Sequence, residues 1–345
     1  MKLNESDKNM PKKMLEIKHL RTSFFTGEGE VKAVDDVNYH VNEKEIVAVV
    51  GESGSGKSVT LLSVLQLVQC PPGRILGGEI IFDGKNLLTC SAKEMRKIRG
   101  DGISMIFQEP MTSLNPVYTV GNQLVEVLRA HDKKLSEKEA WARGAEALEA
   151  VGIPAPEARM NNYPFEMSGG MRQRVMIALA VACRSKLILA DEPTTALDVT
   201  TQAQVMELLT GLVHKMGTSL VIVTHNLGLV SRYADRTNIM YAGKIVESGT
   251  TETILTHPGH PYTIGLLKSV PRLDMGREET LQPINGAPPR LTNLPDYCAF
   301  YDRCGYACEE CRQKPIPVLR AVGGDPNHLA ACHLKIGGTD YGREE

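Results

Sequence analysis

A glycine-rich loop after a short apolar stretch constrains this chain more than any other part of its sequence. Ile46 to Val50 is apolar and rich in β-branched residues, as in a buried strand, and residues 51–58 match G-x-x-x-x-G-K-[ST] at every fixed position. Glycines in this pattern let successive backbone N–H groups curl round a phosphate, toward which the next helix directs its positive dipole end. The residues expected around the phosphates are Gly51, Glu52, Ser53, Gly54, Ser55, Gly56, Lys57 and Ser58.

Two side chains at the end of this loop carry its expected chemistry. Lys57 is placed to reach the β- and γ-phosphates of a nucleotide, and the Ser58 hydroxyl is placed to bind Mg²⁺. The sequence therefore predicts a site for a nucleoside triphosphate. An ordinary glycine-rich turn before a lysine is the alternative, and the strand and helix patterns on either side of the loop argue against it.

The composition indicates a globular chain without a membrane span of its own. Its 345 residues are 42% hydrophobic, enough for a large core and for two or more folded units. The longest unbroken apolar stretch, Val175 to Cys183, has nine residues, whereas a helix needs roughly 20 to cross a bilayer. The sequence up to Lys13 is polar, unlike a secretory signal, so we expect a cytosolic protein. A formal net charge of -2 argues against nucleic acid as a general partner.

Two acidic residues end a predicted buried strand. Residues 187–190 are apolar and lead straight into Asp191 and Glu192, and adjacent carboxylates there need a counter-ion such as Mg²⁺. We expect Asp191 to hold the water shell of the metal and Glu192 to accept a proton from the attacking water as general base. Two acids in an exposed loop are the alternative.

Two further strands also end in polar side chains. Gln108 follows the strand that begins at Ile103, where a glutamine can contact Mg²⁺ or the attacking water. His225 ends the strand that begins at Ser219, where it can hydrogen-bond a γ-phosphate. Open parallel sheets bind ligands at the carboxyl ends of their strands, so these side chains and the glycine loop are expected at one edge.

A helical insert separates these strands in the sequence. Residues 120–152 are rich in helix formers, and Ser136-x-x-Glu139 is a capping box. Further on, Ser168-Gly169-Gly170 begins an apolar helix, and a serine and two glycines at a helix start can bind an anion. An ordinary N-cap is the alternative, and it is favoured when this motif is taken alone. Two phosphate cradles indicate either two sites or one composite site shared between two copies or homologues. The second reading is more economical.

The regions at the two ends of the chain differ in character. Residues 14–50 alternate as in a small antiparallel β layer, where Phe24 is either a stacking partner for a nucleotide base or an ordinary strand aromatic. Residues 271–297 read as a linker, and five of the eight cysteines follow between 298 and 332. Four of them can hold zinc or an iron–sulfur cluster, and unligated cysteines are the alternative. The positions are Cys298, Cys304, Cys308, Cys311 and Cys332.

The order of these motifs over about residues 14–270 resembles the ATP-binding cassette (ABC) ATPases. The resemblance implies that ATP and Mg²⁺ bind, that Ser58, Gln108 and Asp191 contact the Mg²⁺, and that two subunits close head to tail. Met167 and Met171 depart from the leucine and glutamine usual around the signature, which we expect to be tolerated. By position, residues 51–58 are similar to the Walker A loop, Gln108 to the Q-loop, Ser168-Gly169-Gly170 to the signature that acts on the partner's ATP, Asp191 to the Walker B aspartate, Glu192 to the catalytic base, Ala196-Leu197-Asp198 to the D-loop, His225 to the switch histidine and Phe24 to the base-stacking aromatic.

This resemblance gives an expected architecture. It implies an α/β ABC-ATPase nucleotide-binding fold with a RecA-like parallel sheet core, an antiparallel β subdomain, a helical subdomain over about 110–184 and a cysteine-rich C-terminal extension. The expected divisions are a mobile tail over 1–13, the ATPase domain over 14–270 and the extension over 271–345, with its metal module over 298–332.

Finer stretches resemble one branch of this family, the ATPase subunits of oligopeptide and dipeptide importers. They are EPMTSLNP at 109–116, SGGMRQRVMIA at 168–178, DEPTTALDVT at 191–200 and HPYT at 260–263. In that branch Cys298, Cys304, Cys311 and Cys332 match the ligands of a [4Fe-4S] cluster, with Zn²⁺ as the alternative. Gly305 replaces a frequent proline and Cys308 is additional, so the choice of ligands stays open.

The branch also implies partners and a function. The partners are a second ATPase subunit, for which a heterodimer is favoured over a homodimer, two transmembrane permease subunits and an external peptide-binding protein. The expected function is ATP hydrolysis that powers peptide import from the cytoplasmic face of the membrane, to which the subunit is peripherally bound. A nickel-importer ATPase, a soluble ABC ATPase of nucleic-acid repair and a redox or metal sensor are the alternatives.

Overall fold

A computed structural model of the chain describes residues 11–195, 197–270 and 283–334. The predicted N-terminal tail and the first part of the predicted linker lie almost entirely outside these residues. The described chain forms two compact units. One unit comprises the described parts of residues 1–16, 40–46 and 80–223, and the other comprises those of residues 17–39, 47–79 and 224–345.

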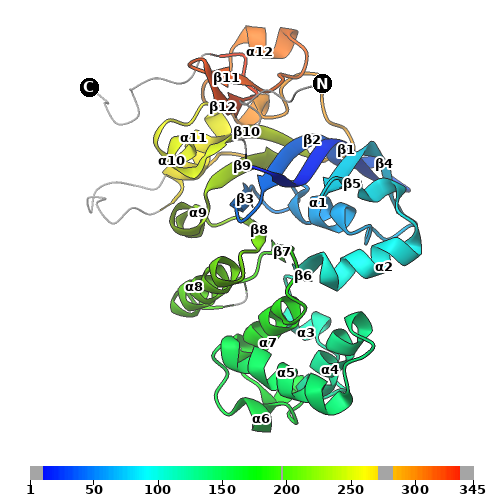
Figure 1. The fold of residues 1–345 in the computed structure, drawn as a ribbon. Coiled ribbons are helices and arrows are strands. Elements are labelled where there is room, and N and C mark those ends of the chain that lie inside the picture. The colour runs from blue at the N-terminus through cyan, green and yellow to red at the C-terminus, as the bar shows by residue number, and fades with distance from the viewer. Residues whose placement is uncertain (1–10, 196, 271–282, 335–345) are drawn as a thin grey trace, which may run out of the picture. The chain divides into compact units, whose positions relative to one another are not determined.

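The unit that contains residues 80–223 combines three parallel strands with a group of helices. Its elements are β5 (Lys85–Asn86), η2 (Leu87–Thr89), α2 (Ala92–Asp101), β6 (Ile103–Ile106), α3 (Pro110–Ser113), α4 (Val120–His131), α5 (Glu137–Ala150), α6 (Pro156–Arg159), η3 (Pro164–Glu166), α7 (Gly169–Ala182), β7 (Leu187–Asp191), α8 (Val199–Met216) and β8 (Ser219–Thr224). The helices α3 to α7 form one group in Figure 1. Their place in the sequence agrees with the expected helical insert.

Strands β6, β7 and β8 are parallel neighbours and consist mostly of buried apolar residues. Ile103 pairs with Leu187, and Leu187 pairs with Ser219. Strands buried on both faces need a continuous run of branched apolar side chains, which these segments supply. Because the strands run in the same direction, the residues that follow each of them emerge at one edge of the unit.

Local signals set the ends of the helices in this unit. The predicted capping box is present at α5, where the Ser136 hydroxyl accepts from the Glu139 backbone N–H and the Glu139 carboxylate accepts from the Ser136 N–H. Helix α8 begins after Asp198, which caps it, and ends at Gly217 with φ 65. A left-handed residue after a helix favours glycine because it has no Cβ.

The other unit contains the phosphate loop and the C-terminal extension. Its elements, some of which continue into the first unit, are β1 (Lys13–Thr26), β2 (Gly29–Asn42), β3 (Ile46–Val50), α1 (Lys57–Val64), β4 (Gly73–Phe82), α9 (Leu227–Tyr233), β9 (Arg236–Tyr241), β10 (Lys244–Thr250), α10 (Thr251–Thr256), α11 (Pro261–Lys268), η4 (Tyr301–Arg303), α12 (Glu309–Gln313), β11 (Arg320–Val322) and β12 (Asp325–Ala330). Strands β2, β1 and β4 are neighbours in that order, so β4, which follows the phosphate loop, joins two of the strands expected over residues 14–50, whereas β3 lies in the other sheet.

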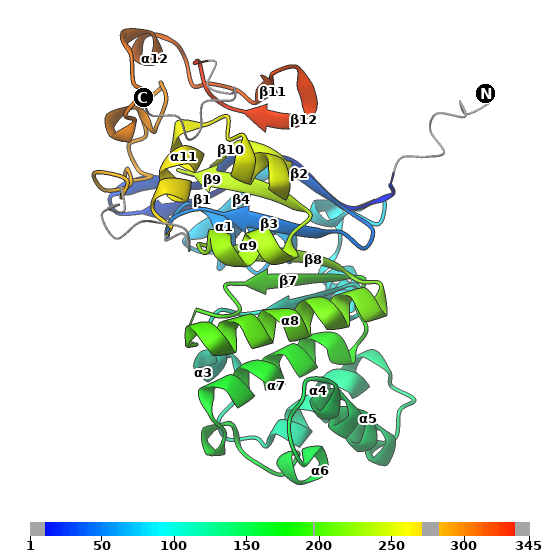
Figure 2. The same ribbon diagram turned by 90° about the vertical axis from the view of Figure 1, so that its left-hand side faces the viewer.

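Strands β3, β9 and β10 lead from the phosphate loop to the extension. Strand β3 pairs with β9 in parallel, and β9 turns into β10 through Ala242 and Gly243, both with positive φ. Positive φ at both central residues is typical of the tight hairpin turn that fits the strand twist. Strand β12 then pairs antiparallel with β10, and Figure 2 shows β12 and β11 beside it. The extension therefore adds β12 and β11 to the sheet that contains β3, the strand that leads into the phosphate loop.

Within the part of the chain that the structure describes, no helix combines the length and apolar character that a membrane span requires.

Candidate functional site

The phosphate loop is held so closely by its neighbours that two of its glycines have no room for a side chain. A Cβ built on Gly51 would lie 2.1 Å from the backbone oxygen of Met240. A Cβ on Gly56 would lie 2.1 Å from the backbone oxygen of Ala33, and Gly56 also has φ 105. Helix α1 begins directly after Gly56, so its first N–H groups point into the loop.

The ammonium group of Lys57 lies inside this loop. Its Nζ donates to the backbone oxygen of Gly51 at 2.8 Å and to that of Glu52 at 2.9 Å, and the residue is only 4% exposed. The Ser55 hydroxyl is also buried, and it has no hydrogen-bond partner among the described residues. A buried cation, an unsatisfied hydroxyl and a helix N-terminus together form a setting that suits an anion.

Phe24 lies in β1 and is partly buried. A Cβ on Gly73 would come 2.9 Å from its ring, so the ring packs on the Gly73 backbone. The neighbouring Phe25 points to the other side of the strand and is 49% exposed. One edge of the Phe24 ring is therefore fixed by packing inside its own unit.

In the unit that contains residues 80–223, Gln108 and Glu192 are brought together. Nε2 of Gln108 donates to Oε2 of Glu192 at 3.1 Å, and Thr195 Oγ1 donates to the same oxygen at 2.8 Å. Glu192 has φ 44, which is uncommon for a residue with a Cβ and is found often at functional sites. Asp191, the last residue of β7, is buried with 6% exposure.

Ser168 caps helix α7 as predicted. Its hydroxyl accepts from the backbone N–H of Met171 at 3.3 Å, and a Cβ on Gly169 would meet nothing within 4 Å. The start of this helix is therefore open on the side of Gly169. In the predicted D-loop, Ala196 lies outside the described residues, whereas the Asp198 carboxylate accepts from the Thr201 N–H, which lowers its pKa.

His225 follows β8 directly and is exposed, just before Asn226 caps helix α9. By chain position it falls in the same unit as the phosphate loop, as does Phe24. Gln108, Asp191, Glu192 and the Ser168 helix start fall in the other unit. The predicted site residues are thus divided into two groups, each with its own internal geometry.

The four cysteines matched by the resemblance line one narrow cavity in the extension. They are Cys298, Cys304, Cys311 and Cys332, and His260, Phe300 and His333 share the lining. The fifth, Cys308, lies beside Cys311 with the two Sγ atoms 3.5 Å apart. Burial raises the pKa of the Cys304 and Cys332 thiols to about 11.

These side chains do not form a ready metal site. Within residues 11–270 and 283–334, leaving out residue 196, no three Cys, His, Asp or Glu side chains are arranged to hold a metal ion. The structure therefore brings the four predicted ligands together, and it does not show the predicted cluster or a zinc site.

A contact that the sequence did not indicate joins the phosphate loop to the extension. The Arg303 guanidinium donates to both carboxylate oxygens of Glu52, at 2.7 and 2.9 Å. The Tyr262 hydroxyl accepts from the Glu52 backbone N–H at 2.9 Å. Only the HPYT stretch, which contains Tyr262, was a sequence signal, and it carried no assigned role.

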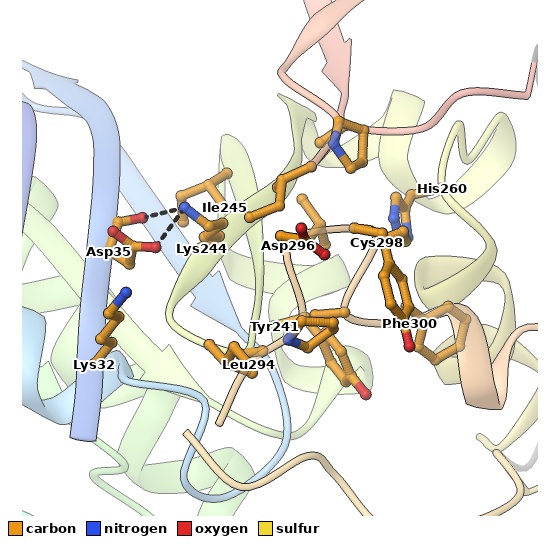
Figure 3. Close-up of a pocket in the computed structure, with 18 residues that line it drawn as sticks. Lys32, Asp35, Tyr241, Lys244, Ile245, His260, Leu294, Asp296, Cys298 and Phe300 are labelled. Carbon is orange, nitrogen blue, oxygen red and sulfur yellow. Dashed lines mark hydrogen bonds and ion pairs between the residues drawn. The ribbon is translucent and has the colours of Figure 1, made fainter. Parts of the chain in front are cut away.

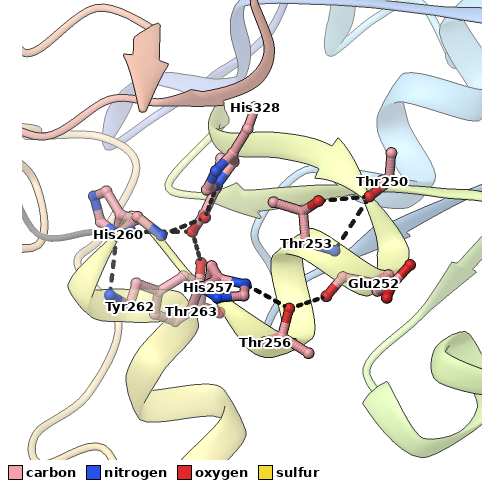
Figure 4. A network of polar contacts seen from close by, with 11 residues as sticks. Thr250, Glu252, Thr253, Thr256, His257, His260, Tyr262, Thr263 and His328 are labelled. Atoms are coloured by element: carbon pink, nitrogen blue, oxygen red, sulfur yellow. Dashed lines mark hydrogen bonds and ion pairs between the residues drawn. The ribbon is translucent and has the colours of Figure 1, made fainter. Parts of the chain in front are cut away.

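Glu247 is a second unpredicted feature. Its carboxylate is completely buried in β10 and accepts from the N–H of Gly259 at 2.6 Å, from that of His260 at 3.0 Å and from the Thr263 hydroxyl at 2.5 Å. His328 Nε2 of β12 lies 2.7 Å from the same carboxylate, and Figure 4 shows His260, Thr263 and His328 on the sides from which these contacts are made. A buried carboxylate is tolerated when several donors surround it, so Glu247 fastens the extension to β10.

A cavity of about 250 Å³ lies between the β9–β10 hairpin and the extension. Figure 3 shows Tyr241, His260, Cys298 and Phe300 on one side of it. The Lys244 ammonium, 2.7 Å from the Asp35 carboxylate, lies on the other. Its lining is mainly apolar, and Tyr241 and Phe300 pack edge to face with their ring centroids 5.3 Å apart.

Two family models match this chain. The model of ABC transporters matches residues 34–195, and the model of the oligopeptide/dipeptide transporter C-terminal region matches residues 246–311. The first includes the phosphate loop, Gln108, the Ser168 helix start and Glu192. The second covers Glu247, the HPYT stretch and three of the four cavity cysteines.

Relatives match over nearly the whole chain. The oligopeptide transport ATP-binding protein OppD of Bacillus subtilis (strain 168) is 53% identical over 304 residues, 88% of this chain and 85% of the relative. OppD of Haemophilus influenzae is 49% identical over 302 residues, 88% of this chain and 92% of the relative.

Among solved structures, the ATP-binding cassette MJ0796 bound to ADP and Pi is 30% identical, with a TM-score of 0.62 over 69% of this chain and 99% of that chain. The chain therefore belongs to the ABC transporter family and is an ABC ATPase. Its C-terminal region is that of the oligopeptide and dipeptide branch. Neither a nickel importer nor a nucleic-acid-repair ATPase is favoured by these matches.

Proposed function

We propose that this chain binds and hydrolyses ATP to power an importer of dipeptides or oligopeptides. The observation that carries the nucleotide part is the burial of Lys57 inside a loop in which Gly51 and Gly56 have no room for a side chain. The curated relatives that bear the names of peptide transport ATP-binding proteins support the peptide part.

Each group of residues has a role in this proposal. In the phosphate-loop unit, the loop N–H groups and Lys57 bind the phosphates, Phe24 stacks on the base and His225 bonds the γ-phosphate. In the other unit, Glu192 takes a proton from the attacking water, and Gln108 and Thr195 hold its carboxylate. The Ser168 helix start acts on the ATP of a partner subunit, because its open N–H groups suit an anion.

Mg²⁺ fits the oxygen donors that the sequence places beside the nucleotide. Ser58 supplies a hydroxyl at the start of α1, Asp191 a carboxylate at the end of β7 and Gln108 an amide oxygen. Hard oxygen ligands of this kind suit Mg²⁺, which neutralises the charge that develops on the phosphates when it is bound.

The cysteine cavity suits a [4Fe-4S] cluster or Zn²⁺ by its donor set. Four thiols line one cavity, and their raised pKa values show how strongly burial opposes a thiolate there. A bound cation would compensate the thiolate charge, which burial alone penalises. We propose Cys298, Cys304, Cys311 and Cys332 as the ligands, with a structural role in the extension.

The partners follow from the proposed transport function. A second ATPase subunit, preferably a distinct homologue, would complete two composite sites, and two permease subunits would hold the chain at the cytoplasmic face of the membrane. An external peptide-binding protein would deliver the substrate.

The experiment is reconstitution of the purified chain with its co-purified permease and ATPase partners in vesicles, followed by uptake of labelled peptide. We expect uptake that requires ATP and Mg²⁺ and stops with Lys57→Ala. Uptake of nickel in place of peptide would reject the substrate assignment. Failure of the wild-type chain to bind Mg²⁺-ATP would reject the nucleotide assignment.

A further inference from the structure

The second residue of the phosphate loop is held by a side chain from the C-terminal extension. Both oxygens of the Glu52 carboxylate accept hydrogen bonds from the Arg303 guanidinium, at 2.7 and 2.9 Å. The two residues are 251 positions apart in the sequence. The Arg303 side chain is only 7% exposed and that of Glu52 25% exposed, so water screens this pair weakly.

Glu52 is also held at its backbone. The Tyr262 hydroxyl accepts from its N–H at 2.9 Å, and Lys57 Nζ donates to its carbonyl oxygen at 2.9 Å. Its side chain and both of its backbone polar groups therefore have fixed partners, and one of these partners is the lysine expected to bind phosphate. A change at the Glu52 side chain is transmitted directly to the loop.

Arg303 is itself fixed in place by the extension. It ends the 3-10 turn η4, which lies between Cys298 and Cys304, and its Nε donates to the Asn285 backbone oxygen at 3.1 Å. Its guanidinium lies over the Tyr241 ring, 5.8 Å from the centroid. Phe300, one residue before this turn, is buried against Tyr241 and Tyr262. An arginine so restrained acts as a rigid fork.

The negative charge of Glu52 gives the Arg303 guanidinium a role in nucleotide binding. A carboxylate in a loop that binds polyphosphate repels the ligand unless a cation compensates it. Arg303 supplies this cation in a geometry that also fixes the loop. Removal of Arg303 would leave the partly buried carboxylate of this loop residue without its cation, at a cost to binding that does not depend on the overall stability of the fold.

We propose that Arg303 is a positioning residue for nucleotide binding, which neutralises and orients Glu52 so that the phosphate loop accepts ATP. This proposal rests on the proposed function, since it takes residues 51–58 as the ATP site. It gives the C-terminal extension a part in nucleotide affinity.

The test is a double-mutant cycle on the full chain, with the equilibrium Kd for a fluorescent Mg²⁺-ATP analogue as the readout. We expect Arg303→Gln to raise Kd roughly three- to tenfold, which lies in the lower part of the range of coupling between residues in contact. The double variant Glu52→Gln/Arg303→Gln should have a Kd within about twofold of that of Glu52→Gln alone, because the repulsive charge is gone.

Two further variants are controls. Arg303→Lys keeps the positive charge and loses the two-pronged guanidinium, so its Kd should lie between those of wild type and Arg303→Gln. Arg312→Gln, an exposed position of the same extension on α12, is the matched control and should bind as wild type.

Two further measurements separate this role from a structural one. The ratio of the Kd of Arg303→Gln to that of wild type should become smaller between about 0.01 and about 1 M salt, since screening weakens the repulsion between Glu52 and the phosphates. Amide hydrogen exchange on the nucleotide-free chain should be faster at residues 51–56 in Arg303→Gln and unchanged in helix α5.

Several results would overturn the proposal. One is a Kd of Arg303→Gln at low salt that equals the wild-type Kd. Another is a rise in Kd on adding Arg303→Gln to Glu52→Gln that is as large as the rise on adding it to wild type. A loss of affinity that only follows a lower unfolding midpoint, without salt dependence, would show a structural role. If Lys57→Ala binds the analogue as well as wild type does, the proposed function fails instead, whatever the Arg303 variants do.

Discussion

Gln108 and Glu192 are in direct contact, with Nε2 of the glutamine 3.1 Å from Oε2 of the glutamate. Thr195 donates to the same oxygen at 2.8 Å. Two donors on one oxygen hold the carboxylate in one orientation, as a general base requires. The positive φ of Glu192 adds to this constraint, because the backbone places the side chain at the end of β7 in a conformation that few residues with a Cβ adopt.

Replacement of Glu192 by glutamine should stop hydrolysis and leave ATP binding intact. An amide of the same shape cannot accept the proton from water, and general bases contribute roughly 10²- to 10⁴-fold to a rate. The measurement is ATP turnover by the complete transporter beside the Kd for ATP. Glu207→Gln, at an exposed position of α8, is the control and should hydrolyse ATP as wild type does. Undiminished turnover in Glu192→Gln would remove this residue from the base role.

Loss of one cavity cysteine should abolish a bound metal, whereas loss of Cys308 should not. Cys311 lines the cavity together with the other three proposed ligands, and Cys308 lies to one side of it. We expect Cys311→Ser, purified without oxygen, to lose most of its iron and sulfide, or its zinc, and Cys308→Ser to keep the wild-type content. Metal analysis with an absorption spectrum measures both. A wild-type chain without iron or zinc under these conditions would contradict the cluster.

Stability should fall in mild acid because of His260. Burial lowers the pKa of this ring from 6.5 to about 4, so between these values the unfolded chain binds a proton that the folded chain does not. The neutral His260 therefore makes its full contribution to the free energy of unfolding above about pH 6.5. This contribution is lost as the pH falls toward 4, and the loss is about 3 kcal/mol in total. Nδ1 of His260 also accepts from the Tyr262 N–H and caps α11, which requires a neutral ring.

The measurement is the free energy of unfolding from about pH 7 to about pH 4 in wild type and in His260→Asn. Asparagine can accept the same cap bond and does not titrate in this range. We expect the stability of the variant to depend less on pH by about 3 kcal/mol. Parallel pH profiles for the two proteins would show that His260 does not carry this loss.

Removal of the His328 ring should loosen the extension. His328 Nε2 is 2.7 Å from the Glu247 carboxylate, and both side chains are almost fully buried. His328→Ala leaves this carboxylate without one partner, which costs roughly 1–3 kcal/mol of folding free energy. Denaturant unfolding gives the free energy, and hydrogen exchange at residues 325–330 locates the effect. His214→Ala, at an exposed position of α8, should change neither.

Local signals allowed much of the fold to be predicted. The phosphate loop and the Ser136 capping box each depend on a few consecutive residues whose backbone preferences are known. The strand ends were found in the same way, because Asp191 and Gln108 follow apolar stretches. The contact between Gln108 and Glu192 agrees with their expected place at one edge.

The remaining parts of the site depend on residues that are far apart in the sequence. Glu52 meets Arg303 across 251 positions, and Glu247 meets His328 across 81. Nothing in a local pattern distinguishes Glu247 or Arg303 from any solvated charge. Their importance depends on burial and on a specific partner, and both are set by the packing of the extension against β10.

The pairing of β12 with β10 determines which strand is the edge strand on this side of the sheet. Glu247 lies opposite Ala330, and the Ala331 N–H donates to the Val246 oxygen at 2.8 Å. The outer strand is then β11, which has three residues. Short outer strands resist the edge-to-edge addition of other chains. A chain cut after residue 270 would bare the polar backbone of β10, a longer strand of seven residues, and would be prone to self-association, so the extension also protects solubility.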